Sequence, residues 1–206
     1  MGLLQGSISY ARFFVRGDLP DNHFDSFTEA LRLRALRPLT VDDEDDIRAG
    51  WCNVANPADL ELDAEKLFLD SYLNVGLRID RWVIPGPLFK AHFGEAERAY
   101  LLKRKKERLS KREKEELKKE VSRRLRNHVV PVSKAIDLSW HLDTGIVRFW
   151  SSAASAIEHL EVLFQDTFHL ELVPESPYTT AARLDLPESV LTAIQMLQPA
   201  VYHNAA

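Results

Sequence analysis

Cysteine is nearly absent from this sequence of 206 residues, which contains only Cys52. A single cysteine excludes an intrachain disulfide framework and fits a reducing compartment, so we expect a cytoplasmic protein. No apolar run approaches the ~20 residues that a membrane-spanning helix requires. Residues 1–14 lack the basic segment and the cleavage site of a signal peptide, and the myristoylation pattern is not met. We therefore expect no membrane partner.

Recognisable catalytic patterns are also missing. The eight glycines are scattered and form neither of the common phosphate-binding loops. Cys52 follows a tryptophan in an apolar context without a nearby histidine, which is typical of a core thiol rather than a nucleophile. No part of the chain supplies a nucleophile, a base and an orienting group together. We expect a protein that is not an enzyme and that uses no cofactor.

Two groups of residues are candidates for a metal site, but neither has an established spacing. Asp42–Asp46 is a run of five acids that suits a hard cation, but it lacks the glycine and the spacing of a calcium loop. His141 and Asp143 share one side of a strand, where a structural hydrogen-bonded pair is the alternative to a metal or acid–base pair. We predict a solvated turn, a structural pair and no metal, and rank a metal-dependent nuclease third among the functions.

The order of sequence breaks and periodic segments predicts an α+β fold with mainly antiparallel strand pairing. Runs of β-branched and aromatic residues indicate strands, whereas apolar residues at helical spacing indicate helices. Prolines and the turn residues Asp143-Thr-Gly145 mark the boundaries. The expected strands are 3–16, 50–56, 67–73, 75–84, 135–142, 146–150 and 169–173; the expected helices are 21–37, 87–108, 110–128, 153–167 and 187–197, with an irregular piece from 177.

This order of elements divides the chain into three parts. Residues 1–86 form an amino-terminal α+β unit, residues 87–130 a basic helix pair, and residues 131–206 a carboxy-terminal ββαβ unit with a terminal helix. We therefore expect small antiparallel or mixed sheets, with a projecting pair of basic helices between two sheet units.

Positive charge is concentrated in the helix pair. Leu101–Arg126 holds 13 lysines and arginines against 5 glutamates, so its net charge is +8 in a chain whose net charge is −4, and the remainder carries −12. Such segregation is typical of a surface that binds a polyanion. The alternative is a solvated helix surface whose charges pair with each other, since Glu107–Lys111, Glu115–Lys119 and Glu120–Arg124 are spaced i,i+4.

Helical geometry predicts that the basic pair projects into solvent. Apolar residues of the first helix, Phe89, Phe93, Ala96 and Tyr100, recur at helical spacing after the helix-opening Pro87. Ser110 and Glu113 form a capping box that begins the second helix. Its apolar stripe of Leu117, Val121 and Leu125 is narrow, so most of the helix surface is expected to face water.

Aromatic residues do not indicate base stacking. Trp82, Trp140 and Trp150 fall in expected strands, where such side chains are commonly packed in the core. Nothing matches the glycine–aromatic signature of an RNA-recognition sheet. Contacts from lysine and arginine to a duplex backbone therefore fit the composition better than stacking on single-stranded bases.

Several ordered segments resemble the bacterial recombination-associated RdgC proteins over roughly residues 36–180. These are Gly50-Trp51, the strand 77–85, the proline-opened helix leading into LSKREKEELKKEV (109–121), the Trp140–Gly145 hairpin, the helix 152–164 and LELVPESP (170–177). The resemblance implies an α+β, non-catalytic protein that binds DNA with little sequence preference, associates with the nucleoid and restrains recombination proteins. It also implies a homodimer that surrounds duplex DNA.

Carried over to this chain, the resemblance assigns phosphate contact to the basic helix residues. These candidates are Lys103, Arg104, Lys105, Lys106, Arg108, Lys111, Arg112, Lys118, Lys119, Arg123, Arg124 and Arg126. Typical family members continue well beyond the position of Pro177. The length of this chain is therefore consistent with an open dimer, with a minimal version of the family protein, or with a subunit of a different assembly. The alternative function is a protein–protein interaction subunit, in which the helix pair docks onto a partner.

Overall fold

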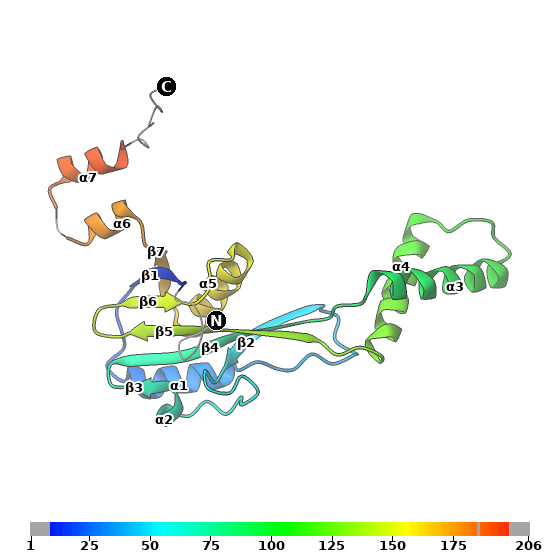
Figure 1. Ribbon diagram of the computed structural model, residues 1–206, viewed down its shortest axis with the longest axis horizontal. Coiled ribbons are helices and arrows are strands. Elements are labelled where there is room, and N and C mark those ends of the chain that lie inside the picture. Colours follow the sequence, from blue (N-terminus) through cyan, green and yellow to red (C-terminus); the bar gives the residue numbers. More distant parts are fainter. Residues whose placement is uncertain (1–8, 185, 198–206) are drawn as a thin grey trace, which may run out of the picture.

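The computed structural model describes residues 9–184 and 186–197, which form an antiparallel sheet, two covering helices and a projecting helical arm (Figure 1). The sheet has the strand order β2-β4-β5-β6-β1-β7, with β3 paired to β4. Its strands are β1 (Ala11–Arg16), β2 (Ile47–Cys52), β3 (Phe68–Leu69), β4 (Tyr72–Arg81), β5 (Val132–His141), β6 (Ile146–Phe149) and β7 (Glu171–Pro174). The helices are α1 (His23–Leu33), α2 (Ala64–Leu67), α3 (Gly86–Arg104), α4 (Lys111–Arg126), α5 (Ala154–Phe168), α6 (Pro177–Ala182) and α7 (Glu188–Gln195).

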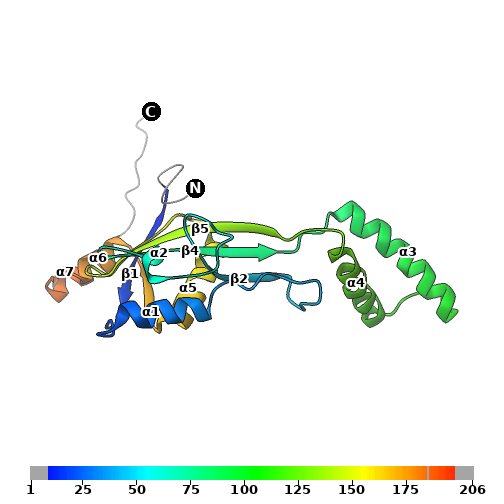
Figure 2. The same ribbon diagram turned by 90° about the horizontal axis from the view of Figure 1, so that it is seen from below.

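One face of the sheet carries the main hydrophobic core. Strands β4 and β5 pair over their whole lengths, and their register places Leu73 opposite Trp140 and Leu77 opposite Ile136. Because opposite residues of paired strands point to the same face, these side chains form continuous apolar rows. Helices α1 and α5 lie on this face, as the view from below shows (Figure 2).

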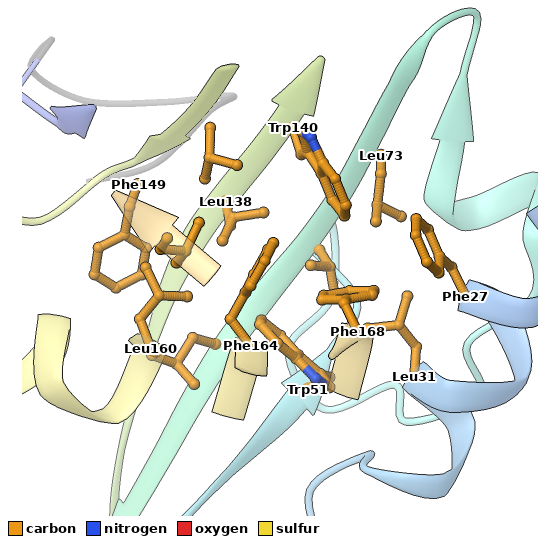
Figure 3. Close-up of a cluster of buried hydrophobic side chains, with 14 of the residues drawn as sticks. Phe27, Leu31, Trp51, Leu73, Leu138, Trp140, Phe149, Leu160, Phe164 and Phe168 are labelled. Carbon is orange, nitrogen blue, oxygen red and sulfur yellow. The ribbon is translucent and has the colours of Figure 1, made fainter. Parts of the chain in front are cut away.

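Aromatic side chains join the two helices to the sheet (Figure 3). The ring of Trp140 lies 5.2 Å from that of Phe164 and 5.3 Å from that of Phe168, both on α5. Trp51 of β2 is fully buried and donates a hydrogen bond of 2.8 Å from Nε1 to Oγ1 of Thr167. The polar atom of this large side chain is therefore satisfied inside the core, as burial requires.

Helices α3 and α4 are inserted between the paired strands β4 and β5 and extend away from the sheet as an arm (Figures 1 and 2). We call residues 86–126 the arm, and the rest of the described chain the body. The arm has its own small core of Leu117, Val121 and Leu125, against which α3 packs Phe89, Phe93 and Tyr100. The apolar stripes predicted from the sequence are thus confirmed as the contact between the two helices.

The α+β class, the antiparallel pairing and the projecting helices are confirmed, whereas the expected pair of separate sheets is not found. Strands from both sides of the arm join one sheet, because β4 and β5 pair directly along ten residues each. The first helix ends at Leu33 rather than 37, since the Leu36 N–H donates to the Trp51 carbonyl of β2 and the Trp51 N–H donates to the Arg34 carbonyl. Residues 177–182 form α6 instead of an irregular piece.

Some expected elements extend beyond what the structure describes. Residues 3–8 of the expected first strand lie outside the described residues, and within them the strand begins at Ala11. Among the helices of residues 9–184 and 186–197, none combines the length and apolarity needed to cross a membrane.

Candidate nucleic-acid interface

The end of the arm carries a cluster of exposed cations. Helix α3 ends where Lys105 adopts a left-handed backbone conformation with φ of 52°, and the chain then turns toward α4. Lys103, Arg104, Lys105, Lys106 and Arg108 are all exposed there, and we call residues 103–108 the tip. The carboxy-terminal end of α3 lies far from the sheet (Figures 1 and 2). The tip therefore holds positive charge away from the acidic body.

A capping box organises the start of α4. The Glu113 carboxylate accepts hydrogen bonds from the Ser110 backbone N–H at 2.9 Å and from Nζ of Lys106 at 2.7 Å. The hydroxyl of Tyr100 donates to the same carboxylate at 3.0 Å. These partners, Lys106 first, lower the pKa of Glu113 to about 2. One carboxylate thus holds α3, the tip and α4 together.

Several candidate cations pair with glutamates of α4 itself. Arg112 pairs with Glu116, Lys118 with Glu115, and Arg124 with Glu120, at distances of 2.8, 2.8 and 3.2 Å. Of the three i,i+4 pairs predicted from the sequence, Glu107–Lys111, Glu115–Lys119 and Glu120–Arg124, only the last forms among the described residues. Exposed pairs of this kind are weak, so they leave these cations available to a competing anion.

The carboxy-terminal half of α4 faces the acid run, which we call the acidic loop (Asp42–Asp46). Arg123 pairs with Asp42, and Arg126 with Asp46, each at 2.5 Å. Arg126 also donates to the carbonyl of Asp43 and is only 6% exposed. A cavity of about 580 Å³ between them is lined by all five acids and by Lys118, Lys119, Ser122, Arg123 and Arg126. The acidic loop is an exposed turn, as predicted, and it also pairs with the arm.

The candidate cations therefore fall into three groups. Arg123 and Arg126 pair with the body, and Lys106, Arg112, Lys118 and Arg124 pair within the arm. The third group forms no ion pair in the described part of the chain: Lys103, Arg104, Lys105, Arg108, Lys111 and Lys119. Lys114, which the sequence prediction omitted, belongs with this group and is exposed; its position between Lys111 and Lys118 was the available signal.

The other candidates from the sequence occupy structural positions. His141 accepts a hydrogen bond from the backbone N–H of Thr144 at 3.3 Å and packs its ring on Tyr72. Cys52 is buried, and burial raises the pKa of its thiol to about 12. Within residues 9–184 and 186–197, no three His, Cys, Asp or Glu side chains are grouped so that they could hold a metal ion.

Comparison with protein-family models and with curated proteins finds no match to this chain.

Proposed function

We propose that this protein binds DNA without base-sequence preference, through lysines and arginines of the arm that contact phosphates. The observation that supports this proposal is the set of cations without an ion pair, which lies mainly at the tip. Four of the six candidates in that set belong to residues 103–108. Cations held away from the body's carboxylates keep their attraction for an external polyanion, because charges beyond about 10 Å are largely screened at ordinary salt.

The packing of the arm's aromatic residues favours backbone contact over base stacking. Phe89, Phe93 and Tyr100 are half-buried against the core of the arm, and Trp51 and Trp140 are fully buried in the body. Rings engaged in these contacts are poorly placed to stack on splayed bases as single-strand binders require. The lysines and arginines remain, and they suit the duplex backbone.

The resemblance to RdgC proteins supports a more specific form of the proposal. The basic helices, the Trp140–Gly145 hairpin and the helix after it occur here in the order in which they occur in that family. On this basis the protein acts as a homodimer on nucleoid DNA and limits the access of recombination proteins.

Salt-dependent binding tests the proposal. Fluorescence polarisation of labelled duplex and single-stranded oligonucleotides is measured between about 50 and 200 mM salt, a range in which counterion release strongly affects the affinity. If six or more phosphate contacts form, duplex affinity falls about 10³-fold or more over this range. An affinity that does not change with salt would overturn the proposal.

The exposed apolar surface of α3 favours a second candidate, docking of the arm onto a protein. No residue of α3 is fully buried, and Leu102 is 81% exposed. Light scattering at two salt concentrations, with and without DNA, separates the two functions. Self-association or partner binding that DNA does not affect would support docking.

A further inference from the structure

The acidic loop is ordered by the body independently of the arm. The Asp43 carboxylate accepts hydrogen bonds from Nη2 of Arg48 at 2.8 Å and from the backbone N–H of Thr40 at 2.6 Å. At the other end of the loop, the Asp46 carbonyl accepts a hydrogen bond of 2.9 Å from the Trp82 backbone N–H. The loop is therefore held at both ends before any contact with α4 is counted.

From this fixed position the loop presents carboxylates to α4. Asp42 and Asp46 reach Arg123 and Arg126, while Glu44 and Asp45 line the same cavity without forming an ion pair in the described residues. The lining contains five acids and four cations, so the acids of the loop outnumber the positive charges of the basic half-helix here. A row of carboxylates opposite lysines and arginines has the charge pattern of a phosphate backbone in the same place.

We propose that the acidic loop is an intramolecular competitor for DNA, which covers the carboxy-terminal half of α4 and confines initial DNA contact to the tip. This inference rests on the proposed DNA binding. The pair of Arg123 with Asp42 is two-thirds or more exposed on both sides, so it is weak and exchangeable. When its local concentration is high enough, DNA displaces the loop and then also contacts Lys118, Lys119 and Arg123.

The test neutralises the two acids that contact α4, as Asp42→Asn with Asp46→Asn. The asparagines keep side-chain oxygens that can accept hydrogen bonds from Arg123 and Arg126, and Asp43 still anchors the loop to Arg48 and Thr40. A matched control, Asp21→Asn with Glu29→Gln, changes the net charge equally at exposed acids of the body that form no ion pair in the described residues. Circular dichroism checks that both variants remain folded.

Two readouts follow. Relative to the control, the loop variant should bind duplex DNA about tenfold more tightly at low salt, and its log–log salt slope should steepen by roughly 3, the value for the three added contacts of Lys118, Lys119 and Arg123. Lysine acetylation read by mass spectrometry should show DNA protecting Lys103 and Lys105 in the unmodified protein, and Lys118 and Lys119 also in the loop variant.

The outcomes separate this inference from the proposed function. Equal affinities of the loop variant and the control, or equal protection of Lys118 and Lys119 before and after neutralisation, would overturn the competitor role while leaving DNA binding in place. Absence of DNA binding by the unmodified protein and by both variants would overturn both proposals. DNA binding by the loop variant, without binding by the unmodified protein or the control, would support a loop that blocks DNA binding completely.

Discussion

The guanidinium carbon of Arg126 lies 5.7 Å from the ring centroid of Trp82, at the junction of the arm and the sheet. Arg126 is the last residue of α4, and Trp82 directly follows β4. The same guanidinium pairs with Asp46 and donates to the Asp43 carbonyl. One buried arginine thus connects the arm, the sheet and the acidic loop, which sets the orientation of the arm relative to the body.

Removing this connection should loosen the arm. Because Arg126→Ala loses the cation–π contact and a partly exposed ion pair, we expect destabilisation by about 1–2 kcal/mol, measured by urea unfolding. Hydrogen exchange should become faster in residues 82–84 and 127–131, which join the arm to the sheet. The control is Arg124→Ala, whose exposed pair with Glu120 should contribute less than about 0.5 kcal/mol. Equal effects of the two substitutions would contradict a role for Arg126 at the junction.

Charge reversal at the tip should weaken DNA binding. The substitutions Lys103→Glu and Lys105→Glu remove two cations that form no ion pair in the described chain, and they leave the Lys106–Glu113 pair in place. Duplex affinity should fall at least tenfold, and the log–log salt slope should become shallower by roughly 2. Arg37→Glu with Lys134→Glu changes the net charge equally at exposed positions of the body. A similar loss of duplex affinity in this control would show that the effect comes from the overall charge and not from the tip.

The start of α4 should respond to acid. The pKa of Glu113 is lowered from 4.5 to about 2, so its ionised form is favoured by the folded arm. The stabilisation is complete above about pH 4.5 and is lost as the pH falls toward 2. Hydrogen exchange of the first turn of α4, measured between these two values, should accelerate on acidification. In Glu113→Gln this exchange should already be fast at neutral pH and should not change over the same range.

Gly50 permits a backbone approach that no other residue would allow. A Cβ atom at this position would lie 2.5 Å from Cα and 2.7 Å from the backbone nitrogen of Leu36. Gly50→Ala must therefore displace residues 34–36 from β2, and we expect destabilisation by about 1–3 kcal/mol in thermal or urea unfolding.

The matched control for that substitution is Gly94→Ala in the interior of α3. An added Cβ there meets nothing within 4 Å. This change should instead stabilise the arm by up to about 1 kcal/mol, because alanine has the higher helix propensity. Destabilisation of similar size by both substitutions would contradict the close approach at Gly50.

Local chemistry in the sequence determined the helices of the arm. Ser110 and Glu113 satisfy each other's backbone groups within one turn, so the beginning of α4 needs no distant residue. The spacing of the residues around Phe93 and around Val121 predicted an apolar stripe on each helix, and the structure shows that these two stripes pack against each other. The alternation of residues in β4 and β5 likewise predicted strands on both sides of the arm.

Only the tertiary structure decided which cations remain available. Asp42 and Arg123 are 81 residues apart in the chain, and no periodic pattern relates them. They meet because β2 and β4 pair side by side, which brings the acidic loop before β2 next to the arm that follows β4. A different pairing, that of β4 with β5 across the arm, merged the two expected sheets into one. Contacts between residues so far apart in the sequence depend on strand order and register. Local sequence patterns do not reveal these, because they result from the packing of the whole chain.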